Sequence, residues 1–167
     1  MTVFLSPSSK KYIVSQLCDK SEAEYMDELT KAIEKELKAS GIDVYRSDTD
    51  ATPTESVRRS NENNVDFHLS FSCLGQSDTT ERGIKIYYPS NDGRSRDRAR
   101  SFSANLKRIY PLPEKVEAVS NCSFIELTQT NAPSILIAIC NINNQSDEKW
   151  FEENLGNLAV EIKRSIN

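Results

Sequence analysis

Apolar residues recur along the chain with two different spacings, and these spacings predict the secondary structure. Between residues 21 and 40 the apolar positions fall three or four residues apart, as on one face of a helix: Met26, Leu29, Ile33 and Leu37. Ser21 followed by Glu24 is the signature of a capping box at a helix start. Gly41 follows the last turn, where glycine commonly ends a helix. The pattern therefore predicts a charged helix over 21–40 with one buried stripe.

Short apolar runs alternate with further amphipathic segments. The runs predict strands over 3–5, 42–47, 65–72, 83–88, 123–127 and 134–139. The amphipathic segments predict helices over 53–64, 95–110 and 147–165, and a polar loop over 75–82. Strands that alternate with helices are typical of an α/β fold. We expect a single domain over 1–167, with a mostly parallel sheet of about six strands and helices on both faces.

Composition narrows the class of partner. The chain carries 21 basic and 25 acidic side chains, a net charge of −4. Nucleic-acid binding needs a basic face, so we expect no nucleic-acid partner.

No stretch approaches the roughly 20 apolar residues of a membrane span. The start, Met1 to Leu5, lacks the features of a signal peptide. The protein is thus expected in the cytoplasm, or as an exported chain whose signal was removed.

Four cysteines are present, at positions 18, 73, 122 and 140, and none forms a CxxC pair. Their spacing matches no structural zinc motif. We expect mostly reduced, buried thiols. An alternative is that Cys73 and Cys140, which both follow predicted strands, together bind a soft metal or form a disulfide.

Ligands of open α/β sheets bind at the carboxyl ends of the strands. The segments at these ends are Ser6–Ser9, Ser72–Leu74, the loop after Tyr88, and Ala138–Asn144. They offer Ser, Cys, Ala and Asn, whereas a hydrolase would be expected to show His, Asp or Glu. His68, the single histidine, lies too far along its strand to reach the position of Ser72. We interpret it as a structural side chain, hydrogen-bonded at the edge of the core.

Several short motifs, in order, carry a family resemblance. They are Val3-Phe4-Leu5-Ser6-Pro7-Ser8, Asp66-Phe67-His68-Leu69-Ser70 and Ala132-Pro133-Ser134-Ile135-Leu136-Ile137. Together they resemble the catalytic domain of the zinc-dependent N-acetylmuramoyl-L-alanine amidases, in particular clostridial forms. The resemblance covers nearly the whole chain and implies an amidase-like fold and a cell-wall (peptidoglycan) substrate.

The resemblance also implies a site. Members of this family bind zinc through His, Glu and His and use a further Glu as general base. The ligand positions fall on Ser9, Glu22 and Ser72, and the base position falls on Ala138. Only Glu22 retains the family's residue type. We therefore expect no catalytic residue, no metal site and no bound zinc or other cofactor.

Three functions remain open at this point. The first is a pseudoenzyme, a binding or regulatory module whose ligand is peptidoglycan peptide or a protein partner. Its expected groove residues are Glu22, Ser72, Cys73, Tyr88, Asn141 and Asn144. The second is an active cell-wall amidase with a rearranged metal site that uses Glu22. The third is a structural or interaction protein of a spore or phage assembly.

Overall fold

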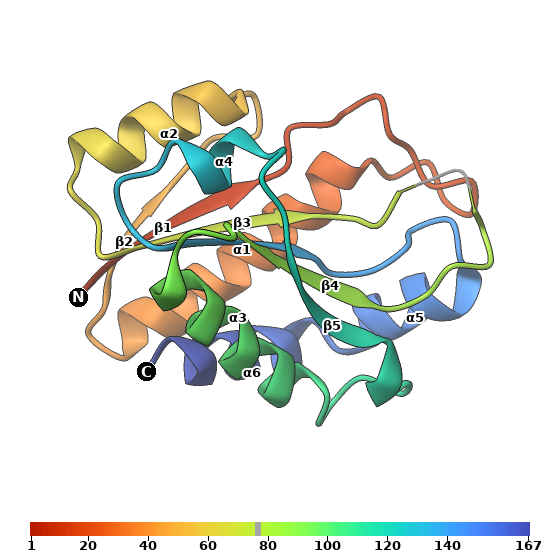
Figure 1. The fold of residues 1–167 in the computed structure, drawn as a ribbon. Coiled ribbons are helices and arrows are strands. Elements are labelled where there is room, and N and C mark those ends of the chain that lie inside the picture. Colours follow the sequence, from red (N-terminus) through yellow and green to blue (C-terminus); the bar gives the residue numbers. More distant parts are fainter. Residues whose placement is uncertain (76–77) are drawn as a thin grey trace.

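The computed structural model describes residues 1–75 and 78–167 and contains one six-stranded sheet (Figure 1). The strand order is β2-β1-β3-β6-β4-β5, and every neighbouring pair is parallel except β4 and β6. The strands are β1 (Thr2–Pro7), β2 (Asp43–Arg46), β3 (Phe67–Ser72), β4 (Ile84–Tyr88), β5 (Val116–Ser120) and β6 (Ser134–Ala138). The predicted fold class, α/β with a mostly parallel sheet of about six strands, is confirmed.

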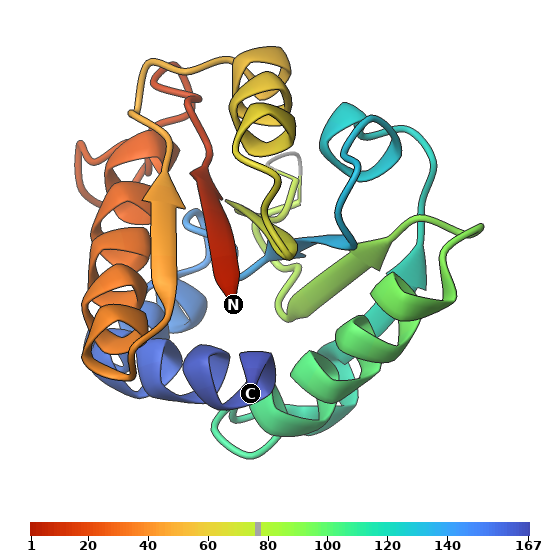
Figure 2. The same ribbon diagram turned by 90° about the vertical axis from the view of Figure 1, so that its left-hand side faces the viewer.

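Helices cover both faces of the sheet, as predicted. They are α1 (Glu22–Ala39), α2 (Pro53–Glu62), α3 (Gly93–Leu106), α4 (Ile125–Thr128), α5 (Gln145–Glu153) and α6 (Leu155–Ile166). A short 3₁₀ helix, η1 (Pro113–Lys115), precedes β5. Figure 2 shows α1, α6 and α3 along one face, and α2 and α4 on the other. None of the helices in the described part of the chain has the length and apolarity that crossing a membrane requires.

The helix predicted over 21–40 is α1, and its capping box is formed. The Glu24 backbone N–H donates to Ser21 Oγ (3.2 Å), and the Ser21 N–H donates to a Glu24 carboxylate oxygen (2.7 Å). The four predicted stripe residues are fully buried: Met26, Leu29, Ile33 and Leu37. Burial of this stripe against the sheet and α6 stabilises the helix far more than its intrinsic propensity does.

Two predicted elements differ from the structure, and one strand was not predicted. Residues 123–127 are not a strand, because the apolar run there forms the short helix α4. The sixth strand is β5, in a stretch that the pattern did not mark. The helix predicted over 147–165 is two helices, because Asn154 leaves helical geometry (φ −115°, ψ 13°). The predicted loop 75–82 includes residues 76 and 77, which lie outside the described residues.

The two faces of the sheet carry different side chains. Val3 and Leu5 of β1 belong to the large apolar core on the α1 side. The alternate residues Phe4 and Ser6 lie in register with His68 and Ser70 of β3 and so share the opposite face, under α2 and α4. This second face is buried yet polar, and it leads to the carboxyl ends of the strands.

Candidate functional site

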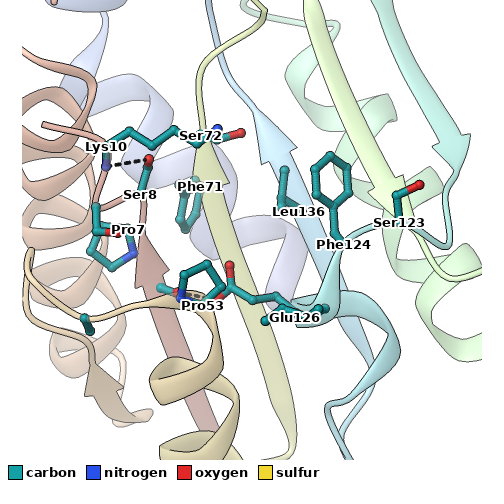
Figure 3. Close-up of a pocket in the computed structure, with 14 residues that line it drawn as sticks. Pro7, Ser8, Lys10, Pro53, Phe71, Ser72, Ser123, Phe124, Glu126 and Leu136 are labelled. Carbon is teal, nitrogen blue, oxygen red and sulfur yellow. Dashed lines mark hydrogen bonds between the residues drawn. The ribbon is translucent and has the colours of Figure 1, made fainter. Parts of the chain in front are cut away.

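A cavity of about 340 Å³ opens at the carboxyl ends of β1 and β3, beside Leu136 in the middle of β6 and beside α2 and α4. Its walls come from segments that are far apart in the sequence, and Figure 3 shows them converging. The lining residues are Ser6, Pro7, Ser8, Ser9, Lys10, Ala51, Pro53, Phe71, Ser72, Ser123, Phe124, Ile125, Glu126 and Leu136. This is the part of an open α/β sheet where ligands usually bind.

The positions to which the resemblance assigns the second zinc ligand and the general base are neighbours in the sheet. Ser72 ends β3 directly opposite Ala138, which ends β6. The Ile139 N–H donates to the Ser72 carbonyl oxygen at 2.9 Å. The loop after β1 approaches the same point, since the Ser8 N–H donates to the Phe71 carbonyl oxygen at 2.9 Å. Ser9 follows in that loop and lines the cavity together with Ser72.

Glu22, the remaining family position, lies in the first turn of α1 and is 1% exposed. Its Oε1 accepts a hydrogen bond of 3.0 Å from the Cys73 N–H. Burial raises the pKa of the Glu22 carboxyl. The Cys73 N–H, the positive charge of Lys10 and the Ser8 hydroxyl act against that rise. Glu22 is therefore held just behind the loop that carries Ser8 and Ser9.

These residues do not fit a zinc ion. Catalytic zinc needs three His, Glu, Asp or Cys ligands and one open position. Of Ser9, Glu22 and Ser72, only Glu22 offers such a donor, and Ala138 has no group that accepts a proton. One further cluster with metal-ligand atoms within 4.8 Å of one another occurs in residues 1–75 and 78–167, formed by Cys18, Glu148 and Glu152. Because that cluster excludes Glu22, it does not rebuild the family's site.

A buried polar network lies on the floor of the cavity. Ser6 Oγ donates to Glu126 Oε1, and His68 Nε2 lies 3.2 Å from the same oxygen. His68 Nε2 also lies 3.1 Å from Ser70 Oγ. The His68 ring is fully buried and stacks on Phe4, with ring centroids 5.2 Å apart. His68 is thus hydrogen-bonded as predicted, although it lies inside the core and not at its edge.

Glu126 is the site residue that the sequence analysis missed. The sequence places it in the apolar run Phe124-Ile125-Glu126-Leu127, which we predicted to be a strand. A lone carboxylate inside an apolar run is a signal of a buried charge, because such groups are buried only with partners. Lys10 was also missed. Figure 3 shows its side chain extending toward Ser72 at the other end of the cavity.

The expected groove residues divide into two groups. Ser72 lines the cavity, and Glu22 and Cys73 are bonded to each other beside it. Tyr88, Asn141 and Asn144 do not line it.

The two asparagines instead hold the segment before β4. Asn141 Nδ2 donates to the carbonyl oxygens of Asp78 and Glu81, each at 2.9 Å. Asn144 caps α5 by accepting from the Asp147 N–H (3.0 Å), and its Nδ2 donates to the Thr79 carbonyl oxygen (2.9 Å). Tyr88 ends β4 half-buried, packed against the core. These contacts give all three residues a structural role.

All four cysteines are free thiols. Cys73 and Cys140 are buried, as predicted, whereas Cys18 and Cys122 are exposed. Cys73 and Cys140 lie close to each other, since the Leu74 N–H donates to the Cys140 carbonyl oxygen at 2.8 Å. The hydrogen bond to Cys140 and burial raise the pKa of the Cys73 thiol.

Comparison with known proteins agrees with the fold. The family model described as N-acetylmuramoyl-L-alanine amidase matches residues 16–167. The sequence has no significant match among curated proteins. Three similar solved structures each cover 99% of this chain.

The first of these structures is an N-acetylmuramoyl-L-alanine amidase of Clostridium difficile 630 (19% identity, 94% of that chain, TM-score 0.86). The second is the amidase AmiC2 of Nostoc punctiforme (14% identity, 94% of that chain, TM-score 0.84). The third is the CwlD amidase of Clostridioides difficile in complex with the GerS lipoprotein (16% identity, 98% of that chain, TM-score 0.76). At these identities the structures establish the shared fold, and the family match over most of the chain establishes the lineage: the protein belongs to the N-acetylmuramoyl-L-alanine amidase family.

Proposed function

We propose that this protein is a catalytically degenerate member of its family that binds peptidoglycan peptide in the cavity at the strand ends. The observation that carries the proposal is the pairing of Ser72 with Ala138. The resemblance places a zinc ligand at the first position and the general base at the second. A hydroxyl is a poor zinc ligand, and a methyl group has no acid–base chemistry.

The chemistry of amide hydrolysis supports the same conclusion. A zinc hydrolase needs a metal that lowers the pKa of water to about 7 and a base that moves its proton. Loss of the base alone costs on the order of 10²–10⁴ in rate. Glu22 remains, but it accepts a hydrogen bond from the Cys73 N–H, and Lys10 lies near it. A carboxylate with these partners is stable in its position without a metal.

The cavity favours a binding role. It combines apolar walls with a few polar groups that converge on it, which is the usual composition of a small-ligand site. Its volume of about 340 Å³ lies at the lower end of the range for such sites. A short peptide segment is a suitable occupant, and the stem peptide of peptidoglycan is the family's peptide substrate.

Retention of cell-wall fragments tests the proposal. Purified peptidoglycan is digested with a muramidase and an active amidase, and the soluble peptides and glycopeptides are passed over immobilised protein. Mass spectrometry of the retained material should show stem peptide. A Ser72→Tyr variant, whose side chain fills the cavity, should retain none. The matched Ser120→Tyr variant, at the exposed end of β5, should behave as the unmodified protein. Absence of retention by the unmodified protein would contradict peptide binding.

A protein partner is a second candidate, favoured by one surface feature. The segment between β1 and α1 exposes three large apolar side chains: Tyr12 (81%), Val14 (41%) and Leu17 (48%). Exposed apolar groups that cluster on one segment are common at protein interfaces. The CwlD structure is that of an amidase bound to a lipoprotein, so the fold is compatible with such assembly. If the protein binds a protein partner and no peptide, neither the unmodified protein nor the Ser72→Tyr variant should retain peptide in the retention experiment.

A further inference from the structure

One oxygen of the Glu126 carboxylate is left for a ligand. Oε1 accepts from Ser6 Oγ and lies 3.2 Å from His68 Nε2. In the described part of the chain, Oε2 of Glu126 accepts no hydrogen bond. It is also not among the unpaired side-chain atoms that are buried away from solvent. Glu126 itself is 8% exposed and lines the cavity. The accessible oxygen of a largely buried carboxylate therefore faces the cavity.

The protein holds this carboxylate rigidly. Glu126 is carried by α4, Ser6 by β1 and His68 by β3, so three separate elements fix its orientation. In the tautomer with a hydrogen on Nε2, His68 donates to Glu126 Oε1, 3.2 Å away. A buried carboxylate with an unpaired oxygen is costly unless a cation or a hydrogen-bond donor completes it. The arrangement favours a positively charged ligand group at Oε2.

The remaining walls define the rest of the ligand. Apart from Glu126 at one end, they are largely apolar, formed by Pro7, Pro53, Phe71, Phe124 and Leu136. At the other end, the Lys10 side chain extends toward Ser72 and supplies a positive charge (Figure 3). A complementary ligand has an ammonium group, a small apolar group beside it, and an anionic group a short distance further along.

We propose that the cavity binds a short peptide with a free amino terminus, whose ammonium group pairs with Glu126 and whose anionic group lies near Lys10. This inference rests on the proposed function and specifies its ligand. In intact peptidoglycan the nitrogen of the first alanine is a neutral amide that cannot form this ion pair. Amidase cleavage converts it into an ammonium group. The protein should thus recognise peptide that active relatives have released, in preference to the uncleaved polymer.

Calorimetric titration of the whole protein tests the inference. The probes are L-alanyl-γ-D-glutamate, the same dipeptide with an acetylated amino group, and an intact muramoyl dipeptide. The free dipeptide should bind at least tenfold more tightly than the other two, because only it can form a charge-assisted bond to Glu126. Equal binding of all three would overturn the inference and leave the proposed function standing. Absence of binding by any probe at millimolar concentration would overturn both.

Two variants add a test on the protein side. Glu126→Gln keeps the shape of the side chain and should weaken binding of the free dipeptide about tenfold or more, without changing binding of the acetylated one. Glu117→Gln, an exposed carboxylate on β5, is the matched control and should change neither. Unchanged binding by a folded Glu126→Gln variant would contradict the inference. If Glu126→Gln fails to fold, the inference is tested by comparing how the unmodified protein binds the free and the acetylated dipeptide.

Discussion

Ser72 and Ala138 lie opposite each other at the carboxyl ends of the adjacent parallel strands β3 and β6. The resemblance assigns a zinc ligand to the first position and the general base to the second. Their pairing brings two positions that are far apart in the sequence to one point in space. The hydrogen-bond pattern between β3 and β6 continues past these two residues, since the Ile139 N–H donates to the Ser72 carbonyl oxygen (2.9 Å). In the proposed function, side-chain chemistry, and not the fold, separates this protein from catalytically active amidases.

Restoring the family's side chains should restore zinc affinity. The triple variant Ser9→His, Ser72→His, Ala138→Glu supplies two imidazoles and a carboxylate next to Glu22. We expect calorimetry to detect zinc binding by this variant at least tenfold tighter than by the unmodified protein. Adding Glu22→Gln to the triple variant should abolish the gain. Equal zinc affinity in the unmodified and triple variants would show that the backbone no longer supports the site.

The pair of His68 and Glu126 should show energetic coupling. His68→Phe keeps the stacking on Phe4 but removes a partner of Glu126, and Glu126→Leu leaves His68 Nε2 with Ser70 Oγ as its remaining partner. Each single variant should lower the free energy of unfolding by about 1–3 kcal/mol. The double variant should cost less than the sum, with a coupling of about 0.5–3 kcal/mol. Urea unfolding of the four proteins measures this coupling, and strict additivity would contradict the network.

Arg46 should stabilise the contact between β2 and α1 in a pH-dependent way. Its guanidinium bonds Asp27 Oδ1 at 2.7 Å and Glu34 Oε2 at 3.0 Å. Burial acts to raise the pKa of both carboxyls, but bonds from lysines and from Arg46 outweigh it and lower both. Because the folded state holds these carboxyls ionised, the stabilisation is present above their ordinary values of 3.8 and 4.5. It is lost as the pH falls through the lowered folded values.

Thermal or urea unfolding across pH tests this expectation. Arg46→Gln should lower the free energy of unfolding by about 1 kcal/mol at pH 7, with a difference that shrinks toward zero below about pH 4. The control is Arg58→Gln, because the Arg58–Glu62 pair is exposed on both sides and should contribute little. A constant difference between Arg46→Gln and the unmodified protein down to pH 2 would argue against these ion pairs.

The four thiols should react with iodoacetamide in two classes. A hydrogen bond with Ser90 Oγ (3.0 Å) lowers the pKa of the exposed Cys122 thiol, so it should be labelled fastest near pH 8. Cys73 and Cys140 are buried with raised pKa values and should react only after unfolding. Mass spectrometry of time points gives the order. Ser90→Ala should slow the labelling of Cys122, and early labelling of Cys73 would contradict its burial.

The sequence pattern predicted the elements that bury a regular stripe or a continuous apolar run. α1 and β3 are examples, because tertiary burial and local pattern agree there. It failed at α4, because a four-residue apolar run has no period that separates a helix from a strand. It missed β5, an edge strand whose alternation over Val116–Ser120 is weak and half exposed.

The candidate site was predictable only in part. The resemblance assigned family site positions to Ser72 and Ala138, and the two residues are paired at the ends of β3 and β6. Their assigned roles stay a prediction. The sequence did not identify Glu126 as a site residue, because its partners, Ser6 and His68, lie 120 and 58 residues away along the chain. No local pattern relates such distant residues, and the network becomes visible only when β1, β3 and α4 are brought together.

The most direct test of the central claim is hydrolysis of purified peptidoglycan by the unmodified protein, with and without added zinc. The assay follows the release of new amino groups and soluble peptide against a buffer blank, with an active relative as positive control. We predict no release above the blank in either condition, because Ser72 and Ala138 provide neither a metal ligand nor a base. Zinc-dependent release that Glu22→Ala abolishes would contradict this account and would show that the protein is an active amidase with a rearranged metal site.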